Sequence, residues 1–155
     1  MSGFIANAGI TPPSTDITSC AFWPVVNLDA LRKELRIDGT VSAERLRAAA
    51  VAAVIDVNDD LDEWRGRQEA AGYTALADVP APQVDGRSRQ VVLYLRAVAC
   101  ATAAEVTERY RSFDASGAGD RKADALTPSI DELRRDLRFA IRDFLRVRRV
   151  TVELI

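Results

Sequence analysis

One stretch of this chain, residues 91–104, constrains the fold more than any other because it is apolar on nearly every side. Its helical pattern is interrupted only by Tyr94, Arg96 and Thr102. A helix that is apolar all round must be covered on most of its surface. In a small protein this requires a central position among other helices, or a second subunit that covers the outer face. We expect this helix to span residues 89–113.

Two helices are predicted before it, from capping residues and from apolar positions three and four residues apart. Asn27 can cap a short first helix over residues 28–37. Ser42 can cap a long second helix over residues 43–71, which Gly72 ends. The buried face of the second helix is predicted to carry Leu46, Ala50, Ala53, Val57, Leu61 and Trp64.

A further helix is predicted near the C-terminus. It begins either at Pro128, with Thr127 as the N-cap, or after Ser129, with Glu132 completing a capping box. Its apolar stripe is predicted to be Ile130, Leu133, Leu137, Ile141 and Phe144. Together the four helices predict an all-α fold that resembles a four-helix bundle.

The two ends of the chain depart from this helical pattern. Residues 1–26 contain prolines that forbid a continuous helix, so we expect an extended arm. Residues 148–155 are rich in β-branched side chains in near alternation, which is typical of a strand. Without another strong strand in the chain, this C-terminal β-strand tail either frays or adds to a sheet of another protein. The helical domain is thus residues 27–147, with a loop that Leu76 and Val79 attach to the core.

The composition excludes several kinds of chemistry. The chain has no histidine, which excludes Ser-His-Asp, Cys-His and histidine–metal mechanisms within it. Cys20 and Cys100 are expected to be free thiols in a reducing cytosol. Four carboxylates on the second helix form a solvated acidic face or a patch for a partner's arginines: Asp56, Asp59, Asp60 and Glu63. We therefore expect no enzyme, no cofactor and no metal.

No membrane segment is predicted either. The apolar run over residues 91–104 is shorter than a bilayer-spanning helix and contains Arg96. The N-terminus has no basic region followed by a continuous apolar stretch, so no secretory signal is expected.

A ridge of arginines follows the last predicted helix. Arginines recur there at steps of three, four, four and three residues: Arg135, Arg138, Arg142, Arg146 and Arg149. Two interpretations stay open, namely a solvated flank paired with Asp136 and Asp143, or a surface for an acidic protein or DNA phosphates. The net charge is −6 over residues 1–86 and +4 over residues 87–155, which suits internal pairing or head-to-tail packing of copies.

Several short motifs occur in order along the chain. They are Phe22-Trp23-Pro24, Glu44-Arg45-Leu46-Arg47, Ala70-Ala71-Gly72-Tyr73, Leu76-Ala77-Asp78-Val79-Pro80-Ala81, Asp85-Gly86-Arg87-Ser88, Arg96-Ala97-Val98, Glu108-Arg109-Tyr110-Arg111, Asp114-Ala115-Ser116, Gly119-Asp120-Arg121-Lys122-Ala123-Asp124, Ser129-Ile130-Asp131-Glu132-Leu133 and Arg135-Asp136-Leu137-Arg138. With these motifs the chain resembles the head completion protein (gpL) family of contractile-tailed temperate bacteriophages. The similarity extends from about Phe22 to about Phe144.

The resemblance implies a structural virion protein, a helical adaptor that connects head and tail. Such proteins bind the portal vertex as a ring after DNA packaging and provide the docking surface for the neck and tail. The ring is expected to match the twelvefold symmetry of the portal and to enclose genomic DNA without sequence specificity. The implied location is the head–tail junction of the virion, and the cytoplasm of the infected bacterium before assembly.

Residue roles follow as expectations. The tail would bind the portal through Arg148, Arg149, Val150, Thr151, Val152, Glu153, Leu154 and Ile155. The ridge would face the portal or the channel through Arg135, Arg138, Arg142 and Arg146. Subunit contacts would involve Trp64, Tyr94 and Arg96. The alternative is a small helical DNA-binding regulatory protein that uses the arginine ridge, but it would need a compact helix-turn-helix and a basic net charge, whereas the net charge is −2.

Overall fold

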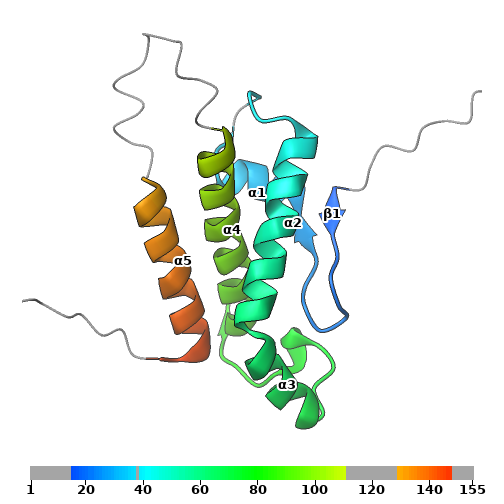
Figure 1. Ribbon diagram of the computed structural model, residues 1–155. Helices are drawn as coiled ribbons and strands as arrows, with labels where there is room; N and C mark the ends of the chain where they lie inside the picture. Colours follow the sequence, from blue (N-terminus) through cyan, green and yellow to red (C-terminus); the bar gives the residue numbers. More distant parts are fainter. Residues whose placement is uncertain (1–14, 38, 111–128, 148–155) are drawn as a thin grey trace, which may run out of the picture.

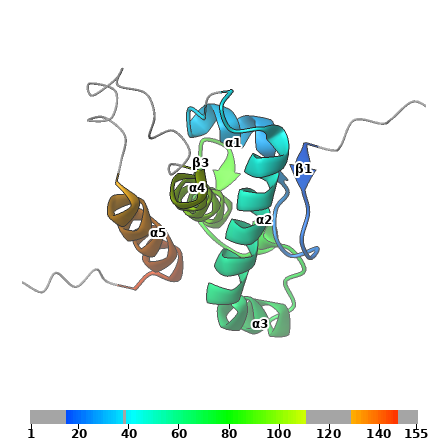
Figure 2. The ribbon, with the colours of Figure 1, turned by 45° about the horizontal axis from the view of Figure 1, so that its top comes forward.

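The fold is built around a central helix that packs between two others (Figure 1). The computed structural model describes residues 15–37, 39–110 and 129–147. Figure 2, turned by 45°, shows the three helices in the same order. The central helix is α4 (Arg89–Tyr110), with α2 (Ala43–Asp60) on one side and α5 (Ile130–Leu145) on the other. The prediction of a mainly helical protein is confirmed.

In detail the arrangement differs from the predicted four-helix bundle. In the described part of the chain, two short helices accompany the three long ones, and four two-residue strands form two small sheets. The short helices are α1 (Leu28–Glu34) and α3 (Asp62–Ala70). The strands β1 (Asp16–Ile17) and β2 (Val26–Asn27) pair antiparallel, as do β3 (Gln83–Val84) and β4 (Arg87–Ser88).

The central position of α4 accounts for its apolar sequence. Tyr94, Ala97, Val98 and Thr102 are all fully buried. The Thr102 hydroxyl donates to the Val98 carbonyl at 2.8 Å, so its polar group is satisfied inside the helix. Burial of a side chain such as Val98 contributes about 1.5–3 kcal/mol. Packing within the subunit therefore covers most of α4, while Arg96 is exposed.

The helix starts are set by local side-chain chemistry. The side chains of Asn27, Ser42 and Ser129 each accept a hydrogen bond from the amide three residues on, at 2.9, 3.3 and 3.2 Å. Glu132 accepts the Ser129 amide in return, which completes the capping box and selects the later of the two predicted starts for α5. The helix α1 ends earlier than predicted, because Arg36, just beyond its C-terminal end, adopts a left-handed φ of 53°.

The predicted long helix over residues 43–71 is interrupted at Leu61. This residue is 0% exposed and has φ −104° and ψ 1°, away from helical geometry. The preceding Asn58, Asp59 and Asp60 have weak helix propensity. The acidic residues that follow suit the positive end of a new helix, so the chain restarts as α3 in a new direction.

Four side chains of residues 15–26 are buried in the core, which corrects the prediction of an extended arm over them: Ile17, Phe22, Trp23 and Val26. Phe22 and Trp23 are buried, and the Phe22 carbonyl accepts the Leu76 amide at 2.8 Å. Large apolar side chains decide the outcome here, because burying them outweighs the cost of ordering the segment. The earlier part of the predicted arm and the predicted strand tail, residues 148–155, lie outside the described residues.

The loop before α4 attaches to the core as predicted, since Leu76 and Val79 are both buried. Leu76 lies in a short 3₁₀ turn, η1 (Leu76–Asp78). The β3–β4 hairpin was not predicted. Its two turn residues, Asp85 and Gly86, have φ values of 50° and 70°, as a two-residue hairpin turn requires.

Candidate interaction surfaces

An aromatic cluster joins the N-terminal segment, α3, α4 and the end of α5. Trp23 stacks on Tyr94 with ring centroids 4.7 Å apart, and Phe144 meets Trp64 edge-on at the same distance. Phe22 lies 5.0 Å from Trp23 and 6.2 Å from Trp64 between ring centroids. Each such pair is worth about 0.5–1.5 kcal/mol beyond its buried area. The cluster therefore fixes four segments relative to one another.

Two of the three predicted subunit-contact residues lie in this cluster. Tyr94 is 0% exposed, and its hydroxyl donates to Asn58 Oδ1 at 2.8 Å. Burial raises the pKa of this phenol. Tyr94 is thus a core residue with no surface for a second subunit, which corrects its assignment. Trp64 is half-buried and Arg96 is exposed, so a subunit contact at these two residues stays a prediction.

The arginine ridge lies on the side of α5 that faces away from α4. Phe144 is fully buried and marks the inner side, and at 3.6 residues per turn Arg135, Arg138 and Arg142 project from the opposite side. Arg135 lies 3.4 Å from Asp136 Oδ1, an exposed pair of the kind that contributes little. Among the described residues, no ion pair engages Arg138 or Arg142.

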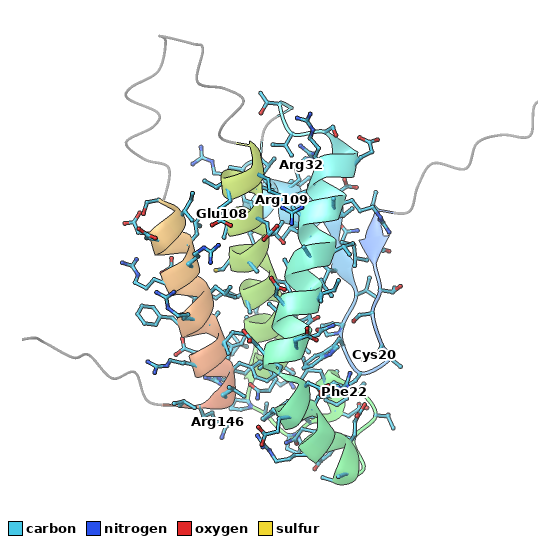
Figure 3. All side chains as sticks on the ribbon, viewed as in Figure 1. Cys20, Phe22, Arg32, Glu108, Arg109 and Arg146 are labelled. Carbon is cyan, nitrogen blue, oxygen red and sulfur yellow. The ribbon has the colours of Figure 1, made fainter. Side chains whose placement is uncertain are left out.

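The C-terminal end of α5 is held by the first turn of α4. Arg146 ends the helix with a left-handed φ of 57° and lies at the end of α5 in Figure 3. Arg89 donates to the Asp143 carbonyl at 3.0 Å, and Gln90 donates to the Phe144 carbonyl at 3.3 Å. These bonds satisfy carbonyls that a helix end leaves without partners, and the Arg89 charge suits the negative end of the helix dipole. The end of α5 is therefore fixed to the first turn of α4.

The four acidic residues predicted as one face divide between different surfaces. Asp59 is exposed on the outer side of α2, and Asp56 is exposed on the adjoining flank. Asp60 lines a groove of about 370 Å³ shared with α5, and Glu63 pairs with Arg67 at 2.6 Å. No group of three or more His, Cys, Asp or Glu in the described segments could hold a metal ion. The four residues therefore do not form a single acidic face.

An apolar strip on the outer side of α2 was missed from the sequence. Val51 is 38% exposed and Ile55 is 54% exposed, one helical turn apart. Val51 also lines a groove of about 520 Å³ together with Thr15 and Leu28. The signal was available, because Ala48, Val51 and Ile55 are apolar at helical spacing but lie off the stripe assigned to the core. Val51 and Ile55 form a small strip that a contact with another molecule would cover.

The cysteines are free, and the central helix has the length of a membrane span. Cys20 is exposed and Cys100 is half-buried, where burial raises the pKa of its thiol. Residues Arg89–Arg109 are long and apolar enough to cross a membrane by length and composition alone, so the prediction of no membrane segment stays a prediction. Core helices of soluble proteins pass the same test, and α4 packs between α2 and α5, which accounts for its composition.

Comparison with known proteins assigns the chain to a family. The family described as phage head completion protein (GPL) matches residues 17–155. A head completion/stabilization protein of Escherichia phage P2 is 43% identical over 125 residues, which make up 81% of this chain and 74% of that protein. No solved structure matches. The family match includes every helix described above. The chain therefore belongs to the phage head completion protein (GPL) family.

Proposed function

We propose that this head completion protein is a head–tail connector that binds the portal vertex as a ring after DNA packaging. The observation that carries the proposal is the family match over residues 17–155, together with the 43% identical phage P2 relative named for head completion and stabilization. A filled head needs its DNA entry vertex closed and adapted before a tail can join. The ring would provide the docking surface for the neck and tail. It would also enclose genomic DNA without sequence specificity.

In this proposal the C-terminal tail, Arg148–Ile155, makes the portal contact. Its alternating β-branched residues suit a strand that adds to an exposed sheet edge. The hydrogen bonds from Arg89 and Gln90 to the end of α5 support this role. A tail with a fixed origin loses less freedom on binding, so more of its contact energy becomes affinity.

The ring is proposed to be dodecameric, in register with the portal. A closed ring needs two different complementary surfaces on each subunit. The unequal charges of the two halves, −6 and +4, and the different helices on the two sides of α4 support such an arrangement. Trp64 and Arg96 remain proposed subunit contacts. Because Tyr94 is excluded, α3 and the exposed part of α4 would provide the subunit contacts.

The test compares the full chain with a variant that lacks residues 148–155, each mixed with portal rings of the same phage. Electron microscopy should show the full chain capping the portal, whereas the shortened chain should leave it bare and keep its helical circular dichroism. Binding by the shortened chain would remove the tail from the proposal. Failure of the full chain to bind would remove the connector function itself.

The alternative function, a small DNA-binding regulator, is favoured by one observation. Within the described residues, Arg138 and Arg142 form no ion pair and so are free to meet phosphates. A regulator should be a monomer or dimer that retards duplex DNA with a steep dependence on salt. A connector should show little preference for any DNA sequence, so the two functions separate in a gel-shift titration against salt.

A further inference from the structure

We infer that neighbouring copies of this protein pack side by side, with the arginine ridge of one copy against the outer side of α2 in the next. The inference rests on the proposed ring and names the surfaces that close it. The alternative is the expectation that the ridge faces the portal or the channel. The ridge contributes Arg135, Arg138 and Arg142, and the facing surface, the α2 patch, consists of Val51, Ile55 and Asp59 on the outer side of α2, with Asp56 on the adjoining flank.

The outer sides of α2 and α5 belong to opposite edges of one subunit, and Arg138 and Arg142 also border a groove that they share with Asp60 of their own subunit. In both views α4 separates α2 from α5 (Figures 1 and 2). On α5 the buried residues Ala140 and Phe144 face inward, which directs Arg138 outward. On α2 the buried stripe that includes Ala53 and Val57 faces inward, so the opposite side of the helix faces away from α4. A ring closes through heterologous contacts, and opposite edges can supply their two halves.

The charges on the two edges are complementary and have no ion-pair partners within the subunit. The segment from Ala48 to Trp64, which covers most of α2 and the start of α3, contains acidic residues but no basic one. Across the described ranges, no ion pair engages Asp56, Asp59, Arg138 or Arg142. A neighbouring copy would bring these groups together. Arginine–carboxylate pairs that lose water at an interface are among the stronger charged hydrogen bonds.

The two surfaces also lie at the same height along the helices. Asp60, at the end of α2, lines one groove with Arg138 and Arg142 of α5. Asp56 and Asp59 lie within about one helical turn of Asp60. The acidic part of the α2 patch and the ridge are therefore level, whereas Val51 lies about 12 Å farther along α2. If the ring axis is parallel to these helices, neighbouring copies are not shifted along the axis. Surfaces at the same height on two neighbouring copies therefore face each other.

Apolar groups accompany the charges on both surfaces. Ile55 and Val51 are the exposed apolar residues of the α2 patch. Leu137 and Ile141, which are half-buried and pack against the core, line the groove beside Arg138 and Arg142. Exposed ion pairs alone contribute little to association. Burial of these apolar groups would exclude water from the charged pairs and thereby strengthen them.

The test is a charge swap, read out as the fraction of portals that carry a complete ring in electron microscopy. Arg138→Glu/Arg142→Glu and Asp56→Arg/Asp59→Arg should each weaken ring formation by about tenfold or more. The variant with all four substitutions should recover, because the pairs are re-formed with reversed charges. An equal mixture of the two double variants should also recover, because alternate copies then pair around an even-numbered ring.

The matched control reverses two exposed charges away from both surfaces, Lys33→Glu and Asp78→Lys, and should leave ring formation unchanged. Thermal melting of every variant identifies any that fail to fold. Recovery in the four-substitution variant and in the mixture supports the inference. Normal rings from both double variants overturn it. It is also overturned if the ridge variant forms complete rings and changes only DNA retention or portal affinity. Absence of rings from the unmodified protein would instead defeat the proposed function.

Discussion

Replacement of Phe144 by alanine should detach the end of α5 from the rest of the molecule. Phe144 is fully buried, with ring centroids 4.7 Å from Trp64 and 6.4 Å from Trp23. Truncation of a buried phenylalanine to alanine costs about 3–5 kcal/mol. That is a large part of the roughly 5–15 kcal/mol by which a domain is stable. Phe139→Ala, at a half-buried position of the same helix, is the matched control and should cost less.

The assay is urea unfolding followed by tryptophan fluorescence. Both tryptophans of the chain contact Phe144, so their emission reports on the cluster directly. The unfolding midpoint should fall far more for Phe144→Ala than for Phe139→Ala, with the slope nearly unchanged. Equal losses for the two variants would refute the reasoning, because the aromatic cluster would then not be what holds the end of α5.

Three further predictions concern glycines, the capping box and the thiols. Gly66→Ala should stabilise the protein by up to about 1 kcal/mol, because the residue lies inside α3 with space for a methyl group. Gly72→Ala should destabilise it by about 1–2 kcal/mol, because φ there is +97°; thermal melts in the reverse order would contradict both. The Ser129 amide lowers the pKa of Glu132 below its ordinary value of 4.5, so the stability from this contact is present above that value and lost as pH falls through the folded-state pKa. The stability difference between the protein and Glu132→Ala should therefore shrink from neutral pH to about pH 3, and a difference that stays constant would count against the capping box. Cys20 should react with a thiol reagent before Cys100, which is half-buried with a raised pKa, and the opposite order in mass spectrometry would exclude this account.

The parts of the fold that sequence predicted well are those with local causes. The caps at Asn27, Ser42 and Ser129 depend on a side chain and an amide three residues away. The central helix was recognised because its own composition demands cover on most sides. The break at Leu61 was missed because the buried stripe continues across it, so periodicity alone gives no sign of the change in direction.

Contacts between distant segments explain the errors about the candidate surfaces. Tyr94 was assigned to a subunit contact, but Trp23 from the N-terminal segment covers it. The exposure of Val51 and Ile55 became visible only when α4 was placed against the other side of α2. The arginine ridge was predictable because helical spacing alone puts its residues on one side.

The most direct test of the connector function is native mass spectrometry of the protein mixed with the intact portal ring of its phage. The account predicts a portal complex that carries twelve copies of this chain, with few intermediate species. A protein that stays monomeric or dimeric beside an unmodified portal, and that retards duplex DNA instead, would contradict it.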